Sequence, residues 1–174
     1  MTGQALPVKV MSFDPGKTTG WCKHFVYAEA KRSFTERHTS EGERHWAGGQ
    51  IGPDEHHDKL YNMLAVEDPK IVVCEAFNYQ IRKLDGVQMP GIELISREYI
   101  GVLKLWCQLR KKPFILQQPS ILSIEWCKDP ALAKLGIYTA GEPHHNDATR
   151  HMLHFIVDEK NGLGRKDYLR PLRH

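Results

Sequence analysis

The feature that most constrains the fold is a short, uninterrupted apolar run at residues 70–74 (KIVVC), which ends directly at Glu75. Uninterrupted β-branched runs are typical of strands that are buried on both faces, beneath covering layers of helices. A second apolar run, residues 8–13 (VKVMSF), ends in the same way at Asp14, directly before Pro15. Both runs therefore predict buried strands with a carboxylate at the strand end.

The other patterns predict an alternation of strands and helices. Residues 92–109 repeat bulky apolar side chains at steps of three and four, which predicts one long amphipathic helix. Early strands followed by alternating helices and strands favour an α/β fold, with a sheet covered by helices. The other expected strands are residues 20–28 (paired with 8–13 as a hairpin), 45–51 and a buried 113–117, and the other expected helices are residues 53–67, 120–126, 130–135 and one starting at Pro143.

Length and composition predict one globular domain. A chain of 174 residues, 41% hydrophobic and 26% charged, is large enough to form its own core. No run approaches the roughly 18 apolar residues of a membrane span, so no membrane association is expected. The lack of an apolar leader segment and the wide spacing of four cysteines favour a cytoplasmic protein with reduced thiols. We expect a domain at residues 1–158 and a basic tail at residues 159–174.

The net charge of +3 is distributed unevenly along the chain. Residues 79–112 hold seven basic and three acidic side chains, and residues 160–174 hold five and one. Such basic stretches either bind phosphate groups or form ordinary solvated surface, and charge alone leaves both interpretations open.

Three acidic residues lie where functional groups gather in α/β proteins, at strand ends and at the start of a helix. Asp14 and Glu75 end strands, and Asp147 lies in the first turn of the last helix. Each alone could be a turn former, a solvent-facing residue or a partner of the helix dipole. Together they would repel one another without a cation, and Mg²⁺ or Mn²⁺ takes such oxygen ligands. His144, one turn before Asp147, is a candidate fourth ligand or proton-transfer group.

Three segments, in this order, resemble motifs of the RuvC-like Holliday junction resolvases of the RNase H-like superfamily. They are SFDPGKTTGW with Asp14, IVVCEAF with Glu75, and HHNDATRHML with His144 and Asp147. A strand ending in Asp-X-Gly also occurs in actin-like ATPases, but 174 residues leave no room for their second, duplicated domain. The resemblance implies an α/β fold of the RNase H-like kind, a mixed sheet flanked by helices.

The resemblance also implies an activity, a metal-dependent endonuclease that cleaves Holliday junctions or other branched DNA as a homodimer. Asp14, Glu75, His144 and Asp147 would hold two Mg²⁺ ions, with Mn²⁺ as a substitute, for phosphodiester hydrolysis. The long helix at residues 92–109 would help to form the dimer. Two alternatives remain: a protein that binds DNA junctions without cutting them, and a nuclease for RNA–DNA hybrids.

Contacts to DNA are expected outside the acidic cluster. The family tends to place an aromatic residue three positions after its glutamate, where it stacks on a base at the junction. That position is Asn78 here, so the neighbouring Phe77 and Tyr79 are the candidates. The tail is a further candidate by charge alone. The basic residues expected to position the DNA backbone are Arg82, Lys83, Arg97, Lys104, Arg110, Lys111 and Lys112.

Overall fold

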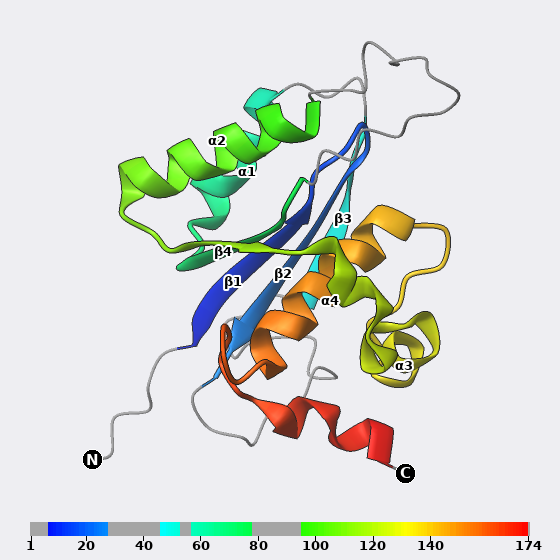
Figure 1. Ribbon diagram of the computed structural model, residues 1–174. Helices are drawn as coiled ribbons and strands as arrows, with labels where there is room; N and C mark the ends of the chain where they lie inside the picture. The colour runs from blue at the N-terminus through cyan, green and yellow to red at the C-terminus, as the bar shows by residue number, and fades with distance from the viewer. Residues whose placement is uncertain (1–6, 28–45, 53–56, 78–94, 174) are drawn as a thin grey trace, which may run out of the picture.

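A computed structural model describes residues 7–27, 46–52, 57–77 and 95–173, and these contain a five-stranded mixed sheet (Figure 1). The strand order is β3-β2-β1-β4-β5. The first three strands along the chain pair antiparallel, whereas β4 runs parallel to β1 and β5 parallel to β4. The mixed sheet agrees with the predicted α/β fold. The strands are β1 (Val8–Asp14), β2 (Thr19–Val26), β3 (Trp46–Ile51), β4 (Ile71–Glu75) and β5 (Phe114–Gln117).

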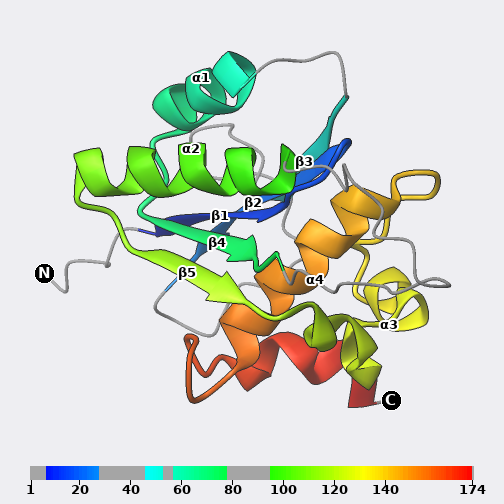
Figure 2. The same cartoon turned by 45° about the horizontal axis from the view of Figure 1, so that its top comes forward.

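Helices cover both faces of the sheet (Figures 1 and 2). The helices α1 (His57–Glu67) and α2 (Ile95–Arg110) lie on one face. The helix α4 (Pro143–Val157) crosses the other face, with α3 (Asp129–Lys134) beside it. Three short 3₁₀ helices complete this second layer: η1 (Pro119–Ser123), η2 (Glu125–Cys127) and η3 (Lys166–Arg173).

The alternation of side chains along the strands sends the two strand-end carboxylates toward α4. In β4, Val72 lies in the core beneath α1 and α2, whereas Val73 lies in the core beneath α4, and both are fully buried. Because alternate residues share a face, Glu75 projects to the α4 side. Val10 also lies in the α4 core, so Asp14 projects to the same side from β1.

Two glycines allow α4 to approach the sheet closely. A Cβ atom on Gly20 in β2 would lie 1.8 Å from the backbone carbonyl oxygen of His144. A Cβ atom on Gly48 in β3 would lie 1.9 Å from Cε1 of the His145 ring. No side chain fits at either distance, so both positions need glycine for α4 to dock.

The structure differs from the sequence-based expectations at β5 and at residues 120–126. Among the described strands only β4 borders β5, which is thus an edge strand, and Leu116 is 51% exposed; the expectation of a buried strand was wrong. The segment expected as one helix at residues 120–126 is η1 followed by η2, because the extended Ile124 interrupts the helical backbone. Residues 28, 45, 53–56 and 92–94, expected at the ends of elements, lie outside the described residues.

The segment expected as a basic tail contains η3, which packs against the domain. Tyr168 is 4% exposed and belongs to the core beneath α4, and its hydroxyl group lies 3.2 Å from Nε2 of His24 in β2. The neighbouring Leu169 and Leu172 also pack against this core. Apolar contacts thus hold this segment in place.

Two further findings concern the membrane and the thiols. In the parts of the chain that the structure describes, no helix is long and apolar enough to cross a bilayer. All four cysteines are free and buried. Burial raises the pKa of the Cys107 thiol to about 11, which leaves this thiol protonated and unreactive at neutral pH.

The close approach at Gly20 predicts opposite effects for two alanine substitutions. Gly20→Ala should lower the free energy of unfolding by about 1–3 kcal/mol, because the new methyl group overlaps the α4 backbone. Gly101→Ala, on the exposed side of α2 with no atom near its new methyl group, should raise it by about 0.5–1 kcal/mol. Urea denaturation measures both changes, and equal stability of Gly20→Ala and wild type would contradict the docking of α4 on β2.

Candidate active site

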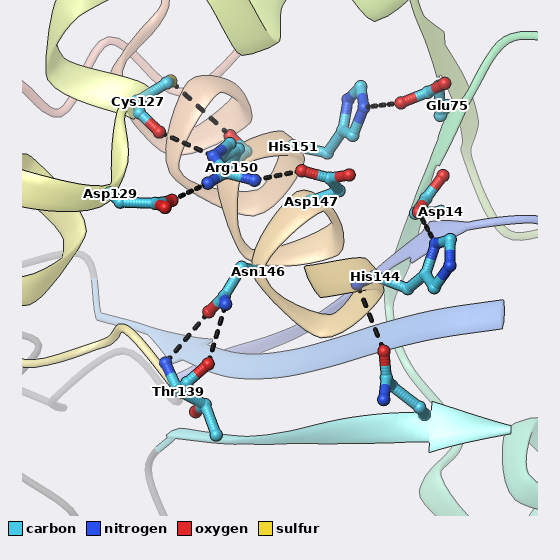
Figure 3. Close-up of polar contacts among 11 residues, drawn as sticks. Asp14, Glu75, Cys127, Asp129, Thr139, His144, Asn146, Asp147, Arg150 and His151 are labelled. Atoms are coloured by element: carbon cyan, nitrogen blue, oxygen red, sulfur yellow. Dashed lines mark hydrogen bonds and ion pairs between the residues drawn. The ribbon is translucent and has the colours of Figure 1, made fainter. Parts of the chain in front are cut away.

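Asp14, the last residue of β1, lies under the first turn of α4 (Figure 3). Its Oδ2 atom is 2.9 Å from Nδ1 of His144, and the residue is only 9% exposed. The pKa of Asp14 is raised to about 6, mainly by burial; the negative charges of Glu75 and Asp147 add to the rise, and the His144 hydrogen bond opposes it. The three carboxylates predicted from the sequence therefore come close enough to influence one another.

Glu75, the last residue of β4, is engaged by a histidine from α4. Nε2 of His151 lies 2.7 Å from Oε2 of Glu75, and Nδ1 of the same ring lies 2.9 Å from Oε1 of Gln117. Both partner atoms are oxygens, which accept hydrogen bonds from the ring. His151 is fully buried, which makes these two hydrogen bonds its means of satisfying both nitrogens.

Asp147 lies one turn into α4 and forms an ion pair with Arg150 on the same helix. The Arg150 guanidinium also pairs with Asp129 at the start of α3, and its Nε–H donates to the carbonyl oxygen of Cys127 at 2.8 Å. Burial raises the pKa of Asp147 despite the opposing charge of Arg150, and the charge of Glu75 adds to the rise. The site therefore holds more negative charge than its environment favours.

Hydrogen bonds from the sheet hold the start of α4 in position. Ser12 Oγ, two residues before Asp14 in β1, donates to the carbonyl oxygen of Ala148 at 2.6 Å. The backbone N–H of His144, which has no partner within the helix, donates to Oε1 of Gln50 in β3 at 3.2 Å. These contacts fix the height and direction of the helix that carries half of the site.

The structure brings together the four residues predicted from the sequence: Asp14, Glu75, His144 and Asp147 (Figure 3). Sequence reasoning missed Arg150 and His151; His144 is one of four histidines on this helix, and its position beside Asp147 distinguished it from the other three. A helical repeat would have indicated His151: positions 144, 147 and 151 are three and four residues apart and share one face.

The donor chemistry of this cluster fits a hard divalent cation. Three carboxylates and an imidazole converge, and the charge of Glu75 adds to the raised pKa values of both Asp14 and Asp147, a condition that a bound cation relieves. Among the residues that the structure describes, no group of three His, Cys, Asp or Glu side chains is arranged to hold an ion as it stands. Each carboxylate is instead engaged by its own basic partner: His144, His151 or Arg150.

The predicted DNA-binding residues separate into three groups. Phe77 follows β4 close to the acidic cluster, with the Arg97 guanidinium 5.6 Å from its ring centroid. Lys111 and Lys112 follow α2 at the opposite end of the strands, where Pro113 accepts a hydrogen bond from the N–H of Val72, and Lys112 pairs with Asp68 at 3.2 Å. Tyr79, Arg82 and Lys83 lie outside the described residues.

Comparison with known proteins places the fold. The sequence matches no protein-family model and no curated protein. Among solved structures, Thermus thermophilus RuvC in complex with a Holliday junction substrate matches with a TM-score of 0.51 at 16% identity, over 85% of this chain and 92% of that chain. This chain has the fold of RuvC. The RNase H-like fold predicted from the three motifs is thereby confirmed.

Two more solved structures match at lower scores. A second structure of Thermus thermophilus RuvC gives a TM-score of 0.48 at 15% identity, over 85% of this chain and 93% of that chain. The yeast mitochondrial Holliday junction resolvase Ydc2 gives a TM-score of 0.46 at 12% identity, over 98% of this chain and 81% of that chain.

The raised pKa of Asp14 predicts a pH-dependent gain in stability from Asp14→Asn. Asp14 has its ordinary pKa of 3.8 in the unfolded chain and a pKa of about 6 in the folded protein. Between these two pH values the folded protein binds more protons than the unfolded chain, so the free energy of unfolding of wild type falls as the pH rises. The shift of this pKa corresponds to a loss of at most about 3 kcal/mol in the free energy of unfolding. In EDTA, Asp14→Asn should therefore be more stable than wild type above pH 6 and similar to it near pH 4. Urea denaturation across this range measures the difference, and a less stable Asp14→Asn protein at pH 8 would contradict the assignment.

Proposed function

We propose that this chain is a divalent-metal-dependent endonuclease that cleaves Holliday junctions or other branched DNA. The observation that carries the proposal is the convergence of Asp14, Glu75 and Asp147 with His144 at adjacent strand ends and the start of α4. The fold adds support, because the RuvC structure that matches at a TM-score of 0.51 is a complex with a Holliday junction substrate.

In this proposal, Asp14, Glu75, Asp147 and His144 hold two Mg²⁺ or Mn²⁺ ions. Such ions, when bound, activate water and neutralise charge on the phosphate. His144 is suited to proton transfer, because Asp14 holds its Nδ1 atom while its side chain remains 42% exposed. Arg150, which is already paired with Asp147 and Asp129, balances charge behind the site.

The proposed DNA contacts are made by residues outside this cluster. Phe77 or Tyr79 would stack on a base, and Arg97, which lies over the Phe77 ring, is well placed to meet a phosphate beside it. Lys111 and Lys112 would contact a DNA arm at the far end of the strands, and Arg82 and Lys83 are proposed as further contacts to the DNA backbone. The basic side chains of residues 159–174 remain candidates for a further arm, on a segment in which Tyr168 belongs to the core and Leu169 and Leu172 pack against it.

Cleavage of defined DNA substrates tests the activity. A labelled four-way junction, a Y-fork, a linear duplex and an RNA–DNA hybrid are incubated with Mg²⁺ or with EDTA. We expect Mg²⁺-dependent cutting of the branched DNA, and a loss on the order of 100-fold or more in Asp14→Asn, because a charge that stabilises the reacting phosphate is removed. Asp58→Asn, which removes an exposed carboxylate from α1, is the matched control and should cut like wild type.

Each alternative gives a different result in the same assay. Tight binding of the junction without cutting, in Mg²⁺ and in Mn²⁺, would show a non-cleaving junction-binding protein. Preferred cutting of the RNA–DNA hybrid would show the second alternative. The acidic cluster disfavours the non-cleaving protein, because carboxylates without a cation repel the DNA backbone.

We also propose a homodimer that forms through α2. Leu105 and Leu109 lie one turn apart on this helix and are 54% and 65% exposed. Two large apolar side chains in one exposed row cost free energy in water, and a second copy of the helix would cover them. A dimer would supply two active sites for the two strands that resolution of a junction requires.

Substitution of this row should separate the protomers. Leu105→Glu combined with Leu109→Glu places like charges at the proposed interface and should convert a dimer to a monomer in sedimentation velocity. Val66→Glu is the matched control, because Val66 is 83% exposed on α1 and its substitution should leave the dimer intact. A wild-type protein that is monomeric at tens of micromolar would contradict the proposal.

A further inference from the structure

His151 is a buried polar residue beside the acidic cluster. It is fully buried on α4, between Arg150 and Met152, and it faces the ends of two neighbouring strands. Burial of a polar ring costs several kcal/mol unless hydrogen bonds replace the lost water. Its partners Glu75 and Gln117 supply those bonds and are paired residues in the β4–β5 register. One ring therefore clamps the ends of both strands to α4.

Gln117 is itself held, so the ring has a fixed orientation. Gln117 is 8% exposed, and its Nε2 lies 3.4 Å from Nδ1 of His154, which follows His151 by about one turn on α4. Burial lowers the pKa of His154, which keeps that ring neutral and able to accept a hydrogen bond from the Gln117 amide. The amide nitrogen then faces His154, and the amide oxygen faces His151. Gln117 thus donates to His154 and accepts from His151, and the other ring nitrogen of His151 faces Glu75.

Glu75 needs such a partner more than the other two acids do. Its side chain has three rotatable bonds, and the like charges of Asp14 and Asp147 favour rotamers that point away from the cluster. Asp14 and Asp147 have shorter side chains, and their basic partners are partly exposed, with side-chain exposures of 42% for His144 and 13% for Arg150. The donor to Glu75 is fully buried and is therefore not exchanged for water.

We propose that His151 is a positioning residue that, itself oriented by Gln117, holds the Glu75 carboxylate in the conformation that receives the divalent cation. This inference rests on the proposed function, because it assigns Glu75 to the cation. A hydrogen bond from a residue behind a ligand fixes that ligand before the ion arrives, and its loss lowers metal affinity by roughly 10- to 100-fold in proteins.

Three substitutions of buried histidines test the role. His151→Met removes both donors and keeps an apolar side chain of similar length. His151→Gln keeps one amide N–H that can reach Glu75 from the position of Nε2. His24→Met is the matched control, because His24 is also fully buried and lies on β2 with Tyr168 as a partner. Isothermal titration with Mn²⁺ in the absence of DNA measures affinity, and thermal unfolding and junction cleavage are measured in parallel.

We expect His151→Met to weaken Mn²⁺ binding roughly 10-fold or more and to reduce cleavage at fixed Mn²⁺. His151→Gln should restore affinity to within about threefold of wild type, as only a hydrogen-bonding role would allow. His24→Met should bind Mn²⁺ like wild type, although both methionine variants lower the melting temperature. Wild-type affinity in His151→Met, an equal loss in His24→Met, or no recovery in His151→Gln would each overturn the inference.

A second variant keeps the test decisive if His151→Met does not fold. Gln117→Leu leaves Glu75 and His151 in place and removes only the group that orients the ring. It should weaken Mn²⁺ binding, and unchanged affinity would overturn the inference. Failure of the proposed function gives a different result: a wild-type protein that binds Mn²⁺ and cuts no nucleic acid refutes the endonuclease, while the affinities of the variants still decide the role of His151. A wild-type protein that binds no Mn²⁺ refutes both.

Discussion

The docking of α4 on the sheet is the contact on which the rest of the structure depends. The helix reaches the sheet only because Gly20 and Gly48 have no side chains, and Ser12 then bonds to its backbone two residues before Asp14. This approach closes one of the two cores and brings Asp147 to the strand ends. Asp14 and Glu75 project to that side because the alternation that buries Val10 and Val73 leaves no other direction.

Charge balance in the site comes almost entirely from one helix. Each of the three carboxylates has a basic partner, and His144, Arg150 and His151 all lie on α4. Even so, burial keeps the pKa values of Asp14 and Asp147 raised, so the partners offset the negative charge only in part. The remaining imbalance is what makes a cation favourable there, and the partners determine how each carboxylate meets it.

The sequence predicts the interior of this fold better than its margins. The runs at residues 8–13 and 70–74 identify β1 and β4, because a strand buried on both faces has a one-dimensional signature. The position of a strand at the edge of a sheet has no such signature. The sequence of β5 predicts a buried strand although Leu116 is half exposed, since exposure depends on which strand lies beside it. The acids of the site follow from their places at element ends. Their partner His151 depends on which face of α4 meets the sheet, and the burial of Tyr168 depends on a contact with distant β2.

That last contact has a consequence for how the protein is made. His24 and Tyr168 are 144 residues apart in the chain, yet they meet in one core. During synthesis, the first hairpin leaves the ribosome long before residue 168 is added, at about 5–20 residues per second. The face of the sheet that α4 and η3 cover therefore stays exposed to the cell for several seconds, as an apolar surface that chaperones can bind. The second core can close only after α4 and η3, which follow all five strands in the chain, have emerged.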